Sequence, residues 1–151
     1  MTAPPGPRLF LLFNHNLTDA QDADARASLG INEIIAAPHD IQALWSQLPP
    51  EAGDLAGLLA PVADWLTAVS RPGDFVLIQG DFSATFLMVS EAMRLGLIPV
   101  SSTTRRVVVE EHQADGSVHL RHTFRHVRFR RYQSAADATR ATPPPQRRKV
   151  T

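Results

Sequence analysis

Three short polar clusters each follow an apolar run, and together they carry groups that suit a phosphodiester ligand. Asn14-His15-Asn16 follows RLFLLF, residues 79–83 (QGDFS) follow FVLI, and residues 101–106 (SSTTRR) follow LIPV. If the apolar runs are parallel strands, the clusters lie at the carboxyl ends, where open α/β sheets bind ligands. We therefore expect all three clusters to project from one edge of the same sheet.

The second and third clusters contain groups that favour anion binding. Gly80 lets the backbone approach a ligand closely. A helix that begins near Ser83 presents free N–H groups and the positive end of its dipole to an anion. Arg105 and Arg106 add planar cationic donors. Asp81 disfavours a phosphate directly beside it, so it either caps the helix or accepts from a ribose hydroxyl or an adenine amino group.

Each cluster also has a purely structural interpretation. Residues 14–18 could form only a turn and a helix cap, and Asp81 or Ser83 could be only an N-cap. Residues 101–104 could form an ordinary exposed loop. The shared position of the clusters at one sheet edge favours a ligand site.

The histidines do not form a recognisable metal-ligand pattern. His119, His122 and His126 are the closest group, but on an extended chain His119 faces away from the other two. No carboxylate or cysteine joins them, so no metal site is expected. The same segment has an alternating polar face that is either a solvated strand edge or a basic wall beside the crevice. Its members are His126, Arg128, Arg130 and Tyr132.

Composition limits the protein class. The 151 residues suggest one domain, and the formal net charge of zero argues against binding of long nucleic acid by a bulk basic surface. The absence of cysteine excludes disulfides, a thiol nucleophile and cysteine-ligated metals.

No Walker or G-x-G-x-x-G motif is present, so no cofactor is expected. No apolar run approaches a membrane span or a signal segment, which predicts a cytoplasmic protein without membrane contact.

The elements that must position the clusters alternate between strand and helix. Thr18 and Gln21 have the spacing of a capping box, so a helix should begin near Asp19 and run to about Leu29, with Gly30 as its stop. Apolar runs predict strands at 8–13, 31–37, 75–79 and 97–101, and helices at 39–48, 55–69 and 82–95, with Pro61 as a kink or a restart. This order predicts an α/β fold, a Rossmann-like and mostly parallel sheet flanked by helices.

The pattern changes after the fourth strand. Asp115-Gly116 between two β-rich runs predicts a C-terminal β-hairpin extension. The apolar phase slips between Phe124 and Val127, which predicts a bulge or a break near Arg125. Residues 1–7 are expected to be a disordered leader and residues 133–151 a disordered tail rich in Pro and basic residues, leaving a folded domain at 8–132.

Four segments resemble the small stand-alone CRISPR-associated ring nucleases, relatives of the CRISPR-associated Rossmann-fold sensor domains: LFLLFNHNLT, LIQGDFSATF, GLIPVSSTTR and FRHVRFRRY. The resemblance covers residues 8–132. It implies a homodimer that binds cyclic tetraadenylate across a two-fold axis and degrades it, which switches off type III CRISPR immunity. The implied reaction is metal-independent: the ribose 2′-OH attacks the adjacent phosphate and leaves a linear product with a 2′,3′-cyclic phosphate.

Roles for the site residues are assigned from the chemistry that the implied reaction requires. His15 is the candidate for proton transfer, because an unperturbed imidazole titrates near neutral pH, and Arg105 is the candidate for phosphate stabilisation. The remaining candidates for ligand binding are Asn14, Asn16, Gln79, Gly80, Asp81, Ser83, Thr103, Thr104 and His126. The alternative function is a non-catalytic protein that binds cyclic oligoadenylate for sequestration or sensing.

Overall fold

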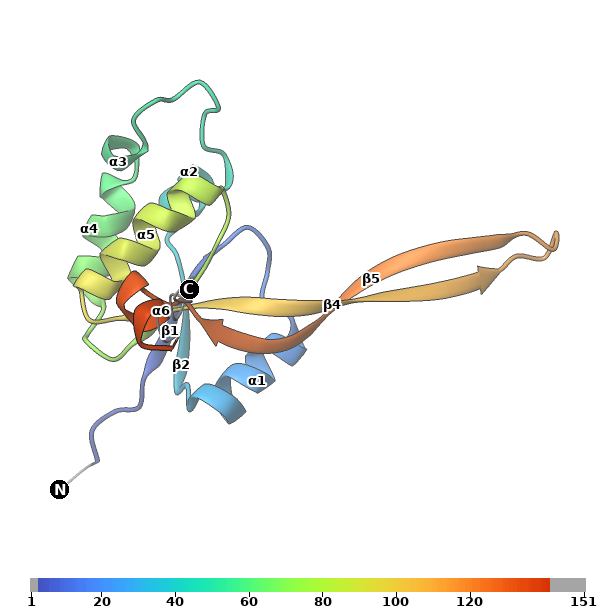
Figure 1. Ribbon diagram of the computed structural model, residues 1–151, viewed down its shortest axis with the longest axis horizontal. Helices are drawn as coiled ribbons and strands as arrows, with labels where there is room; N and C mark the ends of the chain where they lie inside the picture. Colours follow the sequence, from blue (N-terminus) through green and yellow to red (C-terminus); the bar gives the residue numbers. More distant parts are fainter. Residues whose placement is uncertain (1–2, 142–151) are drawn as a thin grey trace, which may run out of the picture.

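A five-stranded sheet forms the centre of the computed structural model, which describes residues 3–141 (Figure 1). Its order is β2-β1-β3-β4-β5, in which neighbouring strands are parallel except for the antiparallel pair β4 and β5. The strands are β1 (Arg8–Phe13), β2 (Glu33–Ala36), β3 (Phe75–Gln79), β4 (Ile98–His112) and β5 (Val118–Arg131). The predicted α/β class, with a mostly parallel sheet and a C-terminal hairpin, is confirmed.

Helices cover both faces of this sheet. They are α1 (Asp19–Leu29), α2 (His39–Ser46), α3 (Leu55–Leu58), α4 (Ala60–Val69), α5 (Phe82–Arg94) and α6 (Ala135–Ala141). Figure 1 shows α1 on one side of the sheet, and α2, α4 and α5 together on the other side. Between residues 3 and 141, no helix is long and apolar enough to cross a membrane.

The core has two parts because successive side chains of a strand point to opposite faces. Leu9, Leu77 and Val100 pack with Ala25 of α1 on one face. On the other face, strand residues pack against α2, α4 and α5 in a larger cluster that includes Phe10, Val76, Ile78, Trp45, Leu66 and Met88. The central strands are buried on both faces, which explains why β1 and β3 read as continuous apolar runs.

The local signals around the helices are largely confirmed. Gln21 N donates to Thr18 Oγ1 at 3.2 Å and Thr18 N donates to Gln21 Oε1 at 2.9 Å, which completes the predicted capping box. Gly30 ends α1 with a φ of 68°, a conformation that favours glycine. Of the two alternatives at Pro61, the structure shows the restart: segment 55–69 is divided into α3 and α4, and Pro61 lies in the first turn of α4.

The C-terminal part differs from expectation in three ways. The fourth strand does not end near residue 101 but runs to His112, so residues 101–106 are strand rather than loop. The predicted bulge exists, but the register shifts where Thr103 pairs with Arg128 and Thr104 with His126, which leaves Val127 as the extra residue. Within the expected tail, residues 135–141 form α6. The other tail residues from 142 onward, and residues 1–2 of the expected leader, lie outside the described part.

The hairpin extends well beyond the rest of the sheet (Figure 1). Pairing of β4 with β3 ends at Val100, whereas pairing with β5 continues to His112. The turn is closed by Gln113 N, which donates to Ser117 O at 2.8 Å, and Gly116 there has a φ of 84°. We call residues 104–126, the part of the hairpin beyond the bulge, the arm.

A buried ion pair ties together the first residues of two central strands. Asp74 accepts from Arg8 N at 3.0 Å, from Arg8 Nη2 at 2.8 Å and from Arg71 N at 2.8 Å. Burial alone would raise the pKa of Asp74, but the hydrogen bonds from Arg71 and Arg8 outweigh it and hold that pKa below its usual value. Asp74 therefore fixes the start of β3 against β1.

Replacement of this carboxylate should destabilise the fold. Asp74→Asn removes the charge that Arg8 faces, and we expect the free energy of unfolding to fall by about 3 kcal/mol. Urea denaturation followed by circular dichroism measures it. The matched control is Asp22→Asn, because Asp22 pairs with Arg26 at 2.7 Å on an exposed surface, where such pairs contribute about 0.5 kcal/mol. Equal losses in the two variants would show that the buried pair has no special role.

Candidate functional site

The first polar cluster lines a hollow at the carboxyl end of β1. Asn14, His15 and Asn16 are exposed and border a cavity of about 410 Å³, together with residues of β1 and of the β2–α2 connection. Gln42 closes one side and its Nε2 donates to Phe13 O at 2.7 Å. The His15 ring meets the Phe13 ring edge-on, with centroids 5.4 Å apart. The histidine is thus oriented by an aromatic neighbour at the mouth of a polar cavity.

Strand register brings the second cluster beside the first. Phe13 pairs with Gln79, so the chain leaves the sheet at the same level into Asn14 on one strand and Gly80 on the next. Asp81 is the N-cap of α5, and its Oδ1 accepts from Ala84 N at 2.9 Å. Of the roles considered for Asp81, the structure shows the cap.

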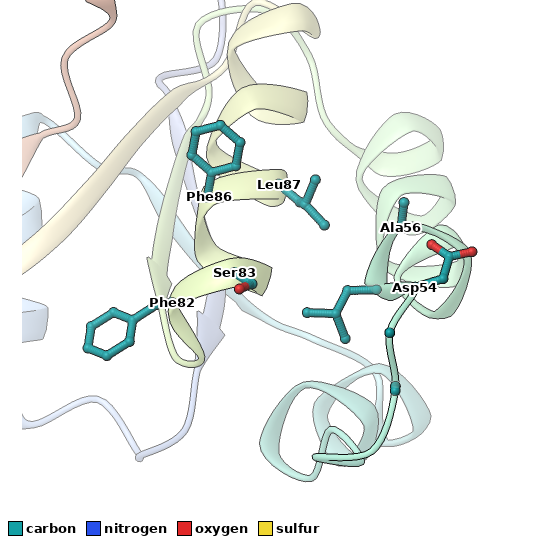
Figure 2. Close-up of a pocket in the computed structure, with 9 residues that line it drawn as sticks. Asp54, Ala56, Phe82, Ser83, Phe86 and Leu87 are labelled. Atoms are coloured by element: carbon teal, nitrogen blue, oxygen red, sulfur yellow. The ribbon is translucent and has the colours of Figure 1, made fainter.

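Ser83 lies in the first turn of α5 but borders a different hollow. Figure 2 shows this cavity, of about 580 Å³, between α5 and the segment that contains Asp54 and Ala56. Phe82 and Phe86 lie on its rim and are largely exposed. Ser83 and His15 are therefore placed at the same end of the sheet but not in one cavity.

Gln79 and Gly80 are explained by contacts within the protein. Gln79 Oε1 accepts from Ser102 N at 2.7 Å, and Gln79 O accepts from Trp45 Nε1 at 3.0 Å. A Cβ at position 80 would lie 2.9 Å from Trp45 Nε1. The close approach expected at Gly80 is therefore made to the indole, and contact with a ligand at these two positions stays a prediction.

The third cluster is divided between the sheet and the base of the arm. Thr103 Oγ1 donates to Arg128 O at 3.0 Å and accepts from Arg128 N at 3.3 Å, so this side chain spans the bulge. Thr104 and Arg105 are exposed. Ser102 lies beside Gln79, the last residue of β3. Arg105 lies three residues further along β4, about 10 Å from Ser102.

Arg105 has a second arginine directly opposite. It pairs across the strands with Arg125, and directly opposed residues project from the same face. Two like charges in this position repel each other, so an anion between them would be stabilising. This pair was not expected, because the sequence does not reveal which residues of the hairpin face one another.

His126 is not placed where the sequence analysis put it. Its side chain is only 5% exposed; Nδ1 lies 2.6 Å from Ser102 Oγ and Nε2 lies 2.6 Å from Asp24 Oδ2. Gln21 Nε2 also donates to Ser102 Oγ, at 3.1 Å. The expectation of one polar face with Arg128 is wrong, because the bulge at Val127 breaks the alternation. His126 instead anchors the arm to α1.

Asp24 completes this buried group, which we call the Asp24–His126–Ser102 network. Hydrogen bonds from Ser28 and then from His126 hold the pKa of Asp24 below its usual value. A signal for it existed in the sequence, since Gln21 and Asp24 are three residues apart and share one face of α1. Among residues 3–141, no three His, Asp or Glu side chains gather as a metal-binding group.

The fold and its polar sheet edge define a small α/β domain with a candidate ligand site at the strand ends. The chain belongs to the family described as the Uncharacterized protein MJ1673 family, whose pattern it matches over residues 7–130. It is 44% identical over 126 residues to the Uncharacterized protein MJ1673 of Methanocaldococcus jannaschii, an alignment that covers 83% of this chain and 97% of that protein. No solved structure matches the chain significantly. The matched region contains the whole arm.

The contact between residues 80 and 45 can be tested directly. Gly80→Ala forces a Cβ against the Trp45 indole, and we expect the free energy of unfolding to fall by about 1–3 kcal/mol. The control is Gly53→Ala, because a Cβ there meets nothing within 4 Å; its effect should stay within about 0.5 kcal/mol. Urea denaturation compares the two. A neutral Gly80→Ala would mean that Trp45 moves aside freely.

Proposed function

We propose that this protein is a ring nuclease that degrades cyclic tetraadenylate and thereby switches off type III CRISPR immunity. The observation that carries the proposal is the His15 hollow. It lies at the carboxyl end of β1, beside the start of α5, where open α/β sheets bind nucleotides. Six of its nine lining residues, at positions 11, 13 and 14–17, belong to the segment LFLLFNHNLT that resembles ring nucleases.

The proposed reaction is an internal transfer at one phosphodiester. His15 takes the proton of a ribose 2′-OH, the 2′-oxygen bonds to phosphorus, and the bond from phosphorus to the 5′-oxygen breaks. The departing 5′-oxygen takes up a proton, so no water is consumed and the product is linear with a 2′,3′-cyclic phosphate. A positioned general base of this kind contributes about 10²–10⁴-fold to the rate.

Charge stabilisation comes from groups near the same edge. The opposed pair Arg105 and Arg125 supplies cationic donors. The N-terminus of α5 is already capped by the Asp81 carboxylate, so it is not assigned to the phosphate. We propose that the protein acts as a cytoplasmic homodimer, because a cyclic ligand with approximate two-fold symmetry fits an isologous pair of sites. The proposal involves neither long nucleic acid nor a membrane.

The first experiment is an assay with radiolabelled cyclic tetraadenylate in excess EDTA, with the products separated by chromatography. Linear products with a 2′,3′-cyclic phosphate are expected. Intact ligand that comigrates with the protein would show binding without cleavage. The function would then be sequestration or sensing of cyclic tetraadenylate. Ligand that is neither cut nor bound would contradict the proposal.

His15→Ala should separate catalysis from binding. We expect single-turnover cleavage to fall by about 10²–10⁴-fold, because the proton acceptor is lost, while the Kd for cyclic tetraadenylate changes little. His39→Ala is the control, since His39 is exposed at the start of α2 and does not line the hollow. Equal losses of binding and cleavage in His15→Ala would make His15 a binding residue.

Arg105→Ala should weaken binding and cleavage together. Loss of charged hydrogen bonds to a phosphate is expected to raise the Kd about tenfold or more. Arg71→Ala is the control, because Arg71 is exposed at the opposite edge of the sheet. If the Kd and the cleavage rate both stay unchanged in Arg105→Ala, the base of the arm is not part of the site.

A further inference from the structure

We propose that the arm is exchanged between two copies of this chain, each arm lying across the partner's α5 with its apolar face on the ridge formed by Phe82 and Phe86. The exchange rests on the proposed function only in that both need a two-fold dimer. It goes further by naming the surfaces that meet.

The first step is that the arm lacks the partners that stabilise a sheet. Within the described residues, its two strands pair only with each other from Thr104 and His126 to the turn. An isolated two-stranded hairpin is marginally stable in water unless a further strand or another element packs on it. An arm of this length therefore calls for a covering surface.

The second step is that one face of the arm carries four large apolar side chains that nothing covers. Directly paired residues share a face, and so do alternate residues along each strand. Phe124, Leu120, Val118 and Val108 consequently lie on one face, with exposures of 67%, 59%, 49% and 51%. Polar residues share this face: Arg106 Nε donates to His122 Nδ1 at 3.1 Å, and Glu110 and His112 pair with Leu120 and Val118.

The third step is a matching surface on the body of the chain. Phe82 and Phe86 are one turn apart on α5 and are 94% and 71% exposed, the highest values among the large apolar side chains of the described residues. Figure 2 shows both rings on the side of α5 that faces away from Asp54 and Ala56. Hollows of about 580 Å³ and about 440 Å³ share these two rings as part of their walls. The two rings thus form a ridge between two hollows. The side chains of an arm can pack into these hollows on either side of the ridge.

The fourth step is charge. The arm, residues 104–126, contains four arginines and three acidic residues, hence +1, whereas residues 1–97 contain four arginines and eleven acidic residues, hence −7. The arm projects away from its own body (Figure 1), so a second copy is what brings its weak positive charge against a net negative body.

The area is sufficient for a specific dimer. Nine residues from Thr104 to His112 make a face roughly 30 Å long and, with its neighbouring strand, roughly 10 Å wide. Where the partner covers the whole of each face, two such faces and the two surfaces on them bury about 1,200 Å², the lower end of the range for specific interfaces.

Cysteine cross-linking tests the exchange, because the native chain contains no cysteine. One copy carries Leu120→Cys and a size tag, and the other copy carries Phe86→Cys. After mixing and mild oxidation, we expect a mixed disulfide between the two copies on a non-reducing gel. The control pairs Leu120→Cys with Val69→Cys, since Val69 is an exposed apolar residue of α4 outside the ridge, and should give little product.

A second measurement uses the mass in solution. Light scattering should give twice the chain mass of 16.6 kDa for the wild type. The double variant Leu120→Glu, Phe124→Glu should be a folded monomer, with a dimer Kd raised about 100-fold or more. Both side chains are exposed, so circular dichroism should show an unchanged body.

Several outcomes would overturn the exchange. A monomeric wild type without mixed disulfide would do so, and so would predominant Leu120→Cys homodimers, which mean that arms pair with arms. Binding of an unrelated single-stranded RNA by the arm, lost in the glutamate variant, would assign the arm to nucleic acid. Cross-linking without cleavage would contradict the proposed nuclease activity and support the exchange of arms. Cleavage without cross-linking would support the nuclease activity and contradict the exchange.

Discussion

The side chain of Gln79 holds together the part of the molecule on which every other feature of the candidate site depends. β3 ends at this residue, and its amide oxygen accepts from Ser102 N, so it continues the contact between β3 and β4 where backbone pairing has stopped. Its own carbonyl accepts from Trp45, which packs against Gly80. Gln79 therefore sets where three parts of the candidate site lie along the sheet: the loop after β1, the start of α5 and the base of the arm.

A second constraint fixes the direction of the arm. The bulge at Val127 turns His126 toward α1, where the Asp24–His126–Ser102 network closes over it. Thr103 spans the same bulge from the other strand. Hydrogen-bonded buried polar groups of this kind specify one arrangement, since any alternative leaves them unsatisfied. The arm therefore leaves the body from a fixed joint.

The sheet and most helices could be read from the sequence because their signals are local. The apolar runs of β1 and β3, the capping box of Thr18 and Gln21, and the turn at Gly116 each depend on residues close together in the chain. The roles of Gly80 and His126 could not be read, since Trp45 lies 35 residues from Gly80 and Asp24 lies 102 residues from His126. The full length of β4 was also missed, because its outer half, RRVVVEEH, has neither an alternating pattern nor a buried residue.

Strand order has a consequence for the way the chain leaves the ribosome. β1 lies between β2 and β3, and β3 lies between β1 and β4. The two central strands, β1 and β3, therefore cannot both have a paired strand on each side until residue 100 has been synthesised. The apolar face of the arm appears only after that, when the sheet that supports its base can already form. Because the arm emerges late, its exposed valine, leucine and phenylalanine side chains spend little time beside a chain that has not yet folded. Such exposure is a cause of aggregation during folding. The order of synthesis thus exposes the aggregation-prone side chains of the arm only after the central strands have been made.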